Sequence, residues 1–244
     1  MNKYKPAEYW ENRLSKRFSL RGVGHQSYSL FYNQWLYRRK AQVLSTIFHD
    51  TKLEQKSVLD IGTGTGFFIA WFKDRGADAT GIDISPTAVQ LLGKQFTDVA
   101  FFEADFTETD PIPIQTYDII NAWDVIYHQP EASAFHKFLT NVAAYCKPGG
   151  YFICSDGFAL PREVSPAPHV KFRNLNVYRN IMAELGFTLR REYPLYKYLN
   201  RTVQNNKLMR YIHQTMAPFL FLLDTIQRLP ASNNLSVCVW QKEQ

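Results

Sequence analysis

Three aspartates in the first half of the chain stand where their carboxylates can meet a ligand. Asp60 and Asp83 each end a short apolar run, and Asp105 follows a third such run. Between the first two lies a glycine-rich turn at residues 62–66, where missing Cβ atoms let the backbone approach a bound molecule. A carboxylate has two acceptor oxygens, which suit neighbouring hydroxyl groups or a cationic group. The glycine turn therefore indicates a ligand-binding site, and Asp60 beside it is compatible with a cationic ligand.

The glycine spacing differs from that of a dinucleotide-binding turn. That turn has the pattern G-x-G-x-x-G, whereas Gly66 comes one residue early here and Phe67 occupies the place of the third glycine. Asp60 also precedes the turn, and its charge would oppose a pyrophosphate. An NAD-dependent oxidoreductase is therefore the weaker interpretation, although the turn leads into a helix whose free amides favour a negative group.

These residues need a scaffold that brings the ends of several strands together. Apolar runs predict strands at residues 57–61, 79–84, 99–102, 117–122, 151–156, 187–193 and 235–241. Helical spacing predicts helices at 28–49, 67–75, 85–96, 132–145, 174–185 and 207–229, the last interrupted by Pro218. Because the central strands alternate with helices, we expect an α/β chain with a parallel sheet covered on both faces.

Five segments together resemble the class I, Rossmann-like S-adenosylmethionine-dependent methyltransferases. They are VLDIGTGTG at 58–66, GIDIS at 81–85, ADF at 104–106, YDIINAWD at 117–124 and KPGGY at 147–151. The resemblance implies a three-layer Rossmann-like methyltransferase fold with a seven-stranded, mostly parallel sheet whose last strand is antiparallel. It also implies the cofactor S-adenosyl-L-methionine, with S-adenosyl-L-homocysteine as product, bound outside the carboxyl ends of the strands.

The resemblance implies cofactor-binding roles for Asp60, Gly62, Thr63, Gly64, Gly66, Asp83, Ile84, Asp105, Phe106, Asn121 and Ala122. Asp60 would meet the methionine amino group, Asp83 both ribose hydroxyls, and Asp105 the adenine amino group. Taken alone, Asp83 is also typical of a helix cap and Asp105 of a turn. Their assignment therefore depends on the whole set of segments.

Residues after the fourth predicted strand are candidates for catalysis. The methyl group of a sulfonium is already activated, so the protein mainly has to align the acceptor with it. An oxygen acceptor also benefits from a base, and this segment offers Tyr127 and His128, with Asp124 nearby. His128 is alternatively a loop residue with an ordinary hydrogen bond. We predict no metal site, because the three cysteines lack the spacing of metal ligands.

Charge is distributed unevenly along the chain. Residues 1–56 hold 11 Lys and Arg against 4 Asp and Glu, residues 57–160 hold 5 against 13, and residues 161–244 hold 12 against 5. Basic flanks predict an anionic small-molecule acceptor, with O-methylation favoured and with His25, Tyr28, Arg38 and Arg173 as candidate substrate-binding residues.

Two other functions within this family stay open. A tRNA, rRNA or other nucleic-acid methyltransferase is the weaker one, because residues 121–124 lack the Pro-Pro-aromatic run of relatives that methylate base amino groups. A non-catalytic S-adenosylmethionine-binding protein is compatible with every segment described above. Strong cofactor binding without transfer to any acceptor would favour it.

We expect a single methyltransferase domain over residues 1–244. It would consist of an N-terminal helical cap at 1–50, a cofactor-binding core at 51–160 and a helical insertion at 194–234 between the last two strands. The apolar residues of the insertion predict core packing or a substrate lid, with a dimer contact or peripheral membrane contact as alternatives. Both a monomer and a homodimer fit. The sequence lacks a signal-peptide pattern and a membrane-spanning apolar run, so we expect a cytoplasmic protein with reduced cysteines.

Overall fold

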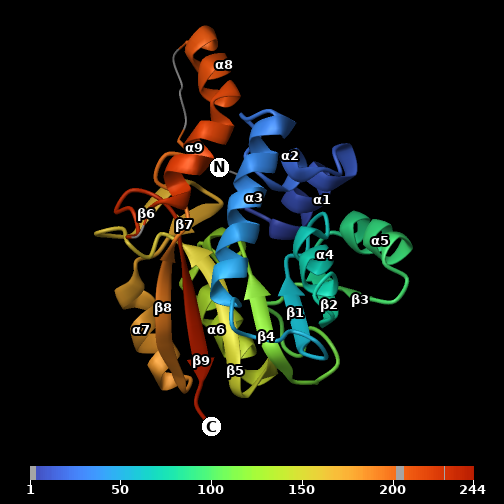
Figure 1. The fold of residues 1–244 in the computed structure, drawn as a ribbon. Helices are drawn as coiled ribbons and strands as arrows, with labels where there is room; N and C mark the ends of the chain where they lie inside the picture. The colour runs from blue at the N-terminus through green and yellow to red at the C-terminus, as the bar shows by residue number, and fades with distance from the viewer. Residues whose placement is uncertain (1–3, 202–205, 228) are drawn as a thin grey trace.

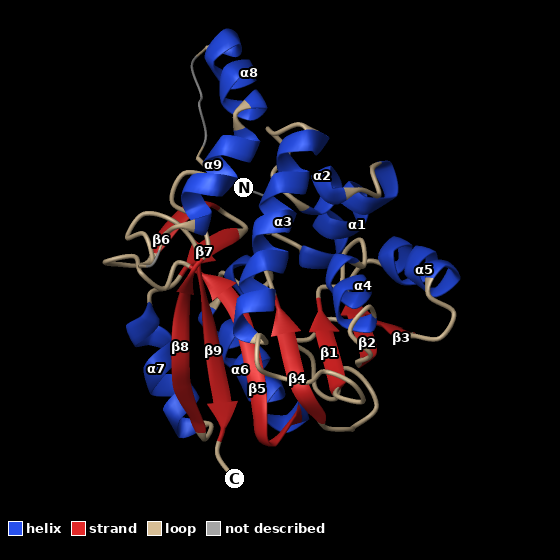
Figure 2. Ribbon diagram, viewed as in Figure 1, coloured by secondary structure: helices blue, strands red, loops and turns tan. Residues whose placement is uncertain are grey.

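A seven-stranded sheet with helices on both faces forms the body of the protein (Figure 1, Figure 2). This computed structural model describes residues 4–201, 206–227 and 229–244. The strand order β3-β2-β1-β4-β5-β9-β8 is formed by Ala100–Glu103, Asp78–Asp83, Ser57–Ile61, Tyr117–Ala122, Cys146–Asp156, Ser236–Lys242 and Phe187–Pro194. Strands β1 to β5 pair in parallel, and β9 runs antiparallel to both β5 and β8. The predicted fold class is confirmed.

Alternate residues of the central strands enter two separate apolar cores. The sheet is covered by helices α3, α4, α6 and α7, which span Leu30–Ile47, Phe67–Lys73, Ala132–Tyr145 and Leu175–Glu184. Leu59 and Ile120 pack in a core with side chains of α6 and α7, whereas Val58 and Ile119 pack in a core with side chains of α3 and α4. Because both faces of these strands are buried, they are nearly continuous apolar runs, which is why the sequence located them.

Several boundaries differ from the predicted ranges. Strand β5 begins at Cys146 instead of residue 151, because Cys146 already pairs with Tyr117 ahead of the Pro-Gly-Gly segment. The region predicted as one interrupted helix at 207–229 forms two helices, α8 (Lys207–Thr215) and α9 (Ala217–Thr225). Pro218 lies in the first turn of α9, where its missing N–H costs no helical hydrogen bond.

The N-terminal segment and the region after β5 contain elements that the sequence did not reveal individually. They are α1 (Pro6–Lys16), α2 (Leu20–Val23) and the hairpin of β6 (Val164–Ala167) and β7 (Val170–Phe172). Helix α1 is attached to the start of α5 (Pro86–Gln95), because Glu11 accepts hydrogen bonds from the Ser85 and Thr87 hydroxyls, both at 2.6 Å. This attachment places α1 beside the carboxyl end of β2.

Helices α8 and α9 project beyond the carboxyl ends of β4 and β5 (Figure 1). Helix α9 is packed on α3, and the ring centroids of Trp35 and Phe221 lie 5.2 Å apart. Asp224 of α9 is fully buried and accepts hydrogen bonds from three backbone amides at 197–199. Within the described ranges, no helix combines the length and apolar character needed to cross a membrane.

Candidate functional site

A cavity lies where the carboxyl ends of β1, β2 and β4 meet α1, α2 and α3. The segments that follow the strands contribute Gly62, Thr63, Gly64, Thr65, Asp83, Ile84, Ala104, Asp105, Phe106, Trp123, Asp124, Val125, His128 and Gln129 to its wall. The N-terminal helices contribute Pro6, Trp10, Leu14, Val23 and Tyr37. This crevice is the location at which parallel α/β sheets bind their ligands.

The glycine turn is built so that its backbone reaches the cavity. Gly62 and Gly64 have φ values of +69° and +58°, which L side chains rarely adopt. A Cβ at Gly62 would lie 2.5 Å from Val125 Cγ2, and a Cβ at Gly64 would lie 2.8 Å from Val23 Cγ1. Gly66 also has a positive φ, but a Cβ there would meet Leu92 and Phe96 of the α5 region. Gly66 therefore serves the packing of α5 and does not line the cavity.

Asp60 has a buried carboxylate oxygen that lacks a partner among the described residues. Its Oδ1 accepts a hydrogen bond of 2.7 Å from Asn121 Nδ2, whereas its Oδ2 accepts none. Burial raises the pKa of Asp60 to about 7, and the charge of Asp83 contributes in the same direction. Neither Asp60 nor Asn121 lines the cavity itself. Both lie near the carboxyl ends of their strands, close in the sequence to residues that do line it. Ala122 is fully buried and also does not line the cavity.

Asp83 ends β2 with its carboxylate held by the backbone. Its Oδ2 accepts from Gly64 N at 2.7 Å and its Oδ1 accepts from Ser85 N at 2.9 Å. Burial raises the pKa of Asp83 to about 6, although these amides oppose the shift. Each oxygen keeps a second lone pair that can accept from a ligand hydroxyl. Asp105 is held in a similar way, because its Oδ1 accepts from the amide and hydroxyl of Thr107 at 2.9 and 2.8 Å.

His128 lies on a short 3₁₀ turn, η1 (Ile126–His128), and forms part of the cavity wall. Its Nδ1 is 3.0 Å from the carbonyl oxygen of His169, which can only accept a hydrogen bond. Burial lowers the pKa of His128 to about 4, so the ring is neutral near pH 7. In the neutral ring the proton therefore resides on Nδ1, and Nε2 keeps a free lone pair.

Aromatic side chains of α1 hold His128 in place. The Trp10 ring meets the His128 ring edge-on at a centroid distance of 4.9 Å. The hydroxyl of Tyr9 is 3.1 Å from Nε2 of His169, whose ring is stacked parallel to that of His128. Helix α1 thus fixes the orientation of the His128 imidazole through Trp10 and, by way of His169, through Tyr9.

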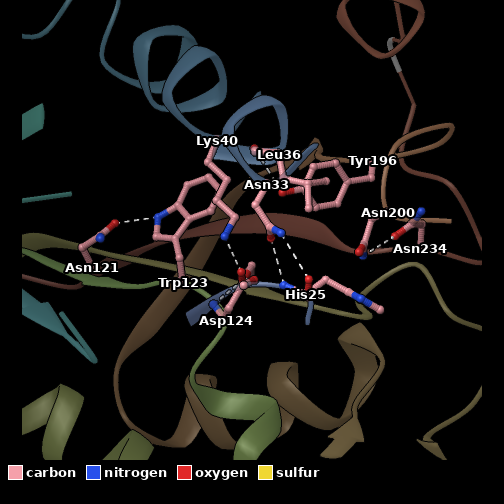
Figure 3. A network of polar contacts seen from close by, with 12 residues as sticks. His25, Asn33, Leu36, Lys40, Asn121, Trp123, Asp124, Tyr196, Asn200 and Asn234 are labelled. Carbon is pink, nitrogen blue, oxygen red and sulfur yellow. Dashed lines mark hydrogen bonds and ion pairs between the residues drawn. The ribbon is translucent and has the colours of Figure 1, made fainter. Parts of the chain in front are cut away.

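Asp124 also lines the cavity and forms an ion pair with the buried Lys40 of α3 (Figure 3). The Asp124 backbone is left-handed, with φ +59°, and its carboxylate also accepts a 3.0 Å hydrogen bond from Ser155 Oγ. Burial alone would raise the pKa of Asp124, but the Lys40 ammonium outweighs it and lowers that pKa. The Lys40 ammonium also lies 3.9 Å from the centre of the Tyr37 ring, which is in the cavity wall.

The geometry described above is that of a cofactor crevice, and comparison with known proteins identifies the family. Residues 32–192 match the family model described as "Methyltransferase domain". The chain belongs to this methyltransferase family. The match covers more than half of the chain and confirms the predicted enzyme class and its Rossmann-like architecture.

Curated relatives and solved structures resemble the chain to different extents. The ubiquinone biosynthesis O-methyltransferase of Alkalilimnicola ehrlichii is 32% identical over 42% of this chain and 42% of its own length. The demethylmenaquinone methyltransferase of Tropheryma whipplei is 29% identical over 62% of this chain and 59% of its own length. The chain thus matches about half the length of these relatives.

Two solved structures share the fold along nearly the whole chain. One is the magnesium protoporphyrin IX methyltransferase of Synechocystis with bound S-adenosylmethionine, at 15% identity and a TM-score of 0.63, covering 100% of both chains. The other is a didemethyltoxoflavin methyltransferase of Burkholderia thailandensis, at 16% identity and a TM-score of 0.62, covering 100% of this chain and 93% of that one.

The predicted substrate residues of this methyltransferase do not gather in its cavity. His25 is stacked on Tyr28 at 4.3 Å, and neither residue lines the cavity. Arg38 is exposed and lies over the Trp35 ring at 4.3 Å. Arg173 is 1% exposed, and its Nη2 donates to the carbonyl oxygens of residues 129 and 130. The Arg173 guanidinium is therefore bound to backbone carbonyl oxygens inside the fold. This finding corrects the prediction that Arg173 binds an anion.

The structure separates the two predicted catalytic residues, and it places three further side chains in the cavity wall or in contact with it. Tyr127 is absent from the cavity wall, and burial together with the charge of Asp124 raises its pKa well above the usual value. The additional residues are Trp10, Arg13 and Lys40. Arg13 lies over the Trp10 ring at 4.7 Å and donates to the Gly24 carbonyl at 2.8 Å. In the sequence, Trp10 and Arg13 are three positions apart, a spacing that places two side chains on the same face of a helix, and this spacing was the available signal for their contact.

Proposed function

We propose that this methyltransferase transfers a methyl group from S-adenosylmethionine to an oxygen of a small-molecule acceptor, with His128 as general base. The observation that carries the proposal is the position of a neutral imidazole in the cavity wall. Its Nδ1 proton is used by the His169 carbonyl, and its Nε2 has no hydrogen-bond partner among the described residues. That nitrogen can accept the proton that an acceptor hydroxyl releases as the new bond to carbon forms.

The residues around the cavity fit the cofactor. The unpartnered Oδ2 of Asp60 suits the cationic amino group of its methionine portion. The open backbone at Gly62 and Gly64 leaves space for the ligand, Asp83 suits the two ribose hydroxyls, and Ile84, Asp105 and Phe106 suit the adenine. When bound, the cofactor would supply an already activated methyl group, and the chain's own residues would orient the acceptor and hold its proton.

The affinity for S-adenosylhomocysteine should depend on the ionisation of Asp60. The pKa of this carboxyl is raised to about 7, so it is protonated at lower pH and then loses its attraction for the ligand's amino group. We expect the affinity to fall about tenfold between pH 8 and pH 6, as for one linked proton. Titration calorimetry across this range measures the effect, and Asp60→Asn should leave only the smaller dependence that Asp83 contributes.

Adenosine provides the control for this experiment, because it lacks the amino acid portion but still reaches Asp83, whose pKa is raised to about 6. Its affinity should change less between pH 8 and pH 7 than that of S-adenosylhomocysteine. Equal pH profiles for the two ligands would show that Asp60 does not bind the amino group.

A flat, largely apolar acceptor fits the remainder of the cavity. Trp10, Tyr37, Phe67, Phe68 and Trp123 line it, and α1 with α2 covers its N-terminal side. Relatives named for ubiquinone and menaquinone biosynthesis support an aromatic small molecule. The covered cavity favours this acceptor class over a nucleic acid.

A screen of phenols, quinols and small aromatic acids tests the proposal, with release of S-adenosylhomocysteine as readout. We expect transfer to at least one phenolic oxygen, and the position of the new methyl group is verified by mass spectrometry. Transfer to tRNA or DNA without transfer to any small molecule would contradict the proposed acceptor class. Tight cofactor binding without any transfer would favour a non-catalytic protein.

A further inference from the structure

Exposed apolar side chains are concentrated on the projecting helices α8 and α9. Among the described residues, nine of the fourteen exposed large apolar side chains lie between positions 208 and 229. We call this set the apical surface: Leu208, Met209, Tyr211, Ile212, Met216, Phe219, Leu222, Ile226 and Leu229. Scattered exposed apolar residues are ordinary on a protein, but a concentration of this kind within one projecting segment points to an interaction site.

Helix α8 has the reverse of the usual orientation for a surface helix. Its contacts with the body are polar, because Tyr32 Oη is 2.9 Å from His213 Nε2 and the Ser29 amide donates to Gln214 Oε1 at 2.7 Å. None of its residues is buried, and Leu208 and Tyr211 are 65% and 68% exposed. A helix that served only the core would direct its apolar residues inward. Core packing, one of the two uses first predicted from the sequence beside a substrate lid, therefore does not explain α8.

The charged side chains beside the apical surface are basic. Lys207 and Arg210 lie on α8 among its apolar residues, and both line a shallow hollow with Phe31 of α3. The only acidic residue from 206 to 227 is Asp224, which is fully buried and bound to backbone amides. An apolar surface with cations at its end is complementary to a lipid bilayer with anionic headgroups.

We propose that the apical surface docks this methyltransferase onto the surface of an anionic bilayer. A second copy of the chain is the weaker occupant, because a two-fold contact through this surface would bring Lys207 and Arg210 of both copies into one interface, and the only acidic residue from 206 to 227 is the buried Asp224. Helices α8 and α9 lie beyond the carboxyl ends of the strands, on the same side of the sheet as the cavity (Figure 1). Docking there would place the cavity near the bilayer, where apolar acceptors partition.

Vesicle flotation of the full chain tests this proposal. We expect binding to vesicles of phosphatidylglycerol mixed with phosphatidylcholine, weaker binding to phosphatidylcholine alone, and a decrease at high salt. The double variant Leu208→Glu/Ile212→Glu should bind at least about tenfold more weakly, because two apolar contacts with the bilayer are lost. The variant Lys207→Glu/Arg210→Glu should lose the preference for phosphatidylglycerol.

Ile114→Glu is the matched control. Ile114 is 77% exposed in the segment before β4, at the opposite end of the sheet, and its variant should float as the unchanged protein does. Absence of binding to either vesicle would overturn the proposal, as would equal binding by Leu208→Glu/Ile212→Glu. A dimer that this variant converts to a monomer would assign the surface to a second copy instead. All variants should keep their affinity for S-adenosylhomocysteine, so this test is independent of the proposed chemistry.

Discussion

Replacing His128 with asparagine should lower kcat for an oxygen acceptor about 10²- to 10⁴-fold, which is the usual contribution of a general base. Asparagine retains an N–H donor near the position of Nδ1, so it can still serve the His169 carbonyl that now lies 3.0 Å from the ring. It has no group that replaces the free Nε2. The variant therefore removes the base while it preserves the hydrogen bond that positions the residue.

The affinity for S-adenosylhomocysteine and the denaturation midpoint separate catalysis from structure. Both should change little in His128→Asn, whereas His128→Ala should lose stability because Trp10 and His169 lose an aromatic neighbour. Exposed His136 on α6 offers a matched control, and His136→Asn should keep full activity. A kcat of His128→Asn within threefold of the unchanged enzyme would show that alignment alone suffices, as it can for methyl transfer.

The pH profile gives a second, independent measurement. Because the pKa of His128 is lowered to about 4, the neutral base predominates from pH 6 to pH 8, and its protonation should not limit kcat in that range. An unperturbed histidine would instead lose half of its activity near pH 6.5. The profile should therefore be flat down to pH 6, and a loss of half of the activity near pH 6.5 would contradict the lowered pKa of the His128 base.

Features encoded within one short segment were predictable from the sequence. The turn at Gly62 and Gly64 needs positive φ values, and only glycine adopts them freely, so its composition reveals its geometry. Asp83 follows a continuous apolar run, and that run identifies a buried parallel strand whose end must reach the crevice. The backbone conformation of the turn and the burial of the strands thus made the cofactor-binding residues predictable from the sequence.

Features that depend on distant partners were not predictable in the same way. Arg173 looked like a surface cation, but the fold brings two backbone carbonyls and the Phe135 ring against its guanidinium. Lys40 follows Leu36 by four residues on the buried side of α3, so its position was typical of an apolar residue. Only the structure shows that Asp124, 84 positions later in the chain, compensates its charge.

The pair formed by Lys40 and Asp124 should be the most sensitive point of the fold outside the apolar cores. The Lys40 side chain is 3% exposed and that of Asp124 is 23% exposed. Lys40→Met would keep the apolar stem and remove the charge, so the carboxylate would keep its hydrogen bond from Ser155 Oγ but lose the ammonium beside it. Breaking a buried pair on one side costs about 3–5 kcal/mol, and we expect the lower end because Asp124 keeps some contact with solvent.

Urea denaturation at pH 8 and pH 5 tests both the size and the cause of this effect. In Lys40→Met, burial is no longer opposed by the ammonium, so the pKa of Asp124 in the folded state rises above its value in the unfolded state. The cost is therefore present above that raised pKa and decreases as the pH falls, because the carboxyl becomes neutral. The variant should be closer to the unchanged protein at pH 5 than at pH 8.

The double variant Lys40→Met/Asp124→Asn completes the cycle. Asparagine can keep an acceptor for Ser155 and carries no charge, so most of the stability lost at pH 8 should return. Equal losses in the single and double variants would instead mean that the Lys40 ammonium stabilises the fold mainly through the Tyr37 ring, 3.9 Å from its Nζ. Because Asp124 and Tyr37 both line the cavity, this ion pair connects the stability of the fold to the wall of the site at which we propose the acceptor binds.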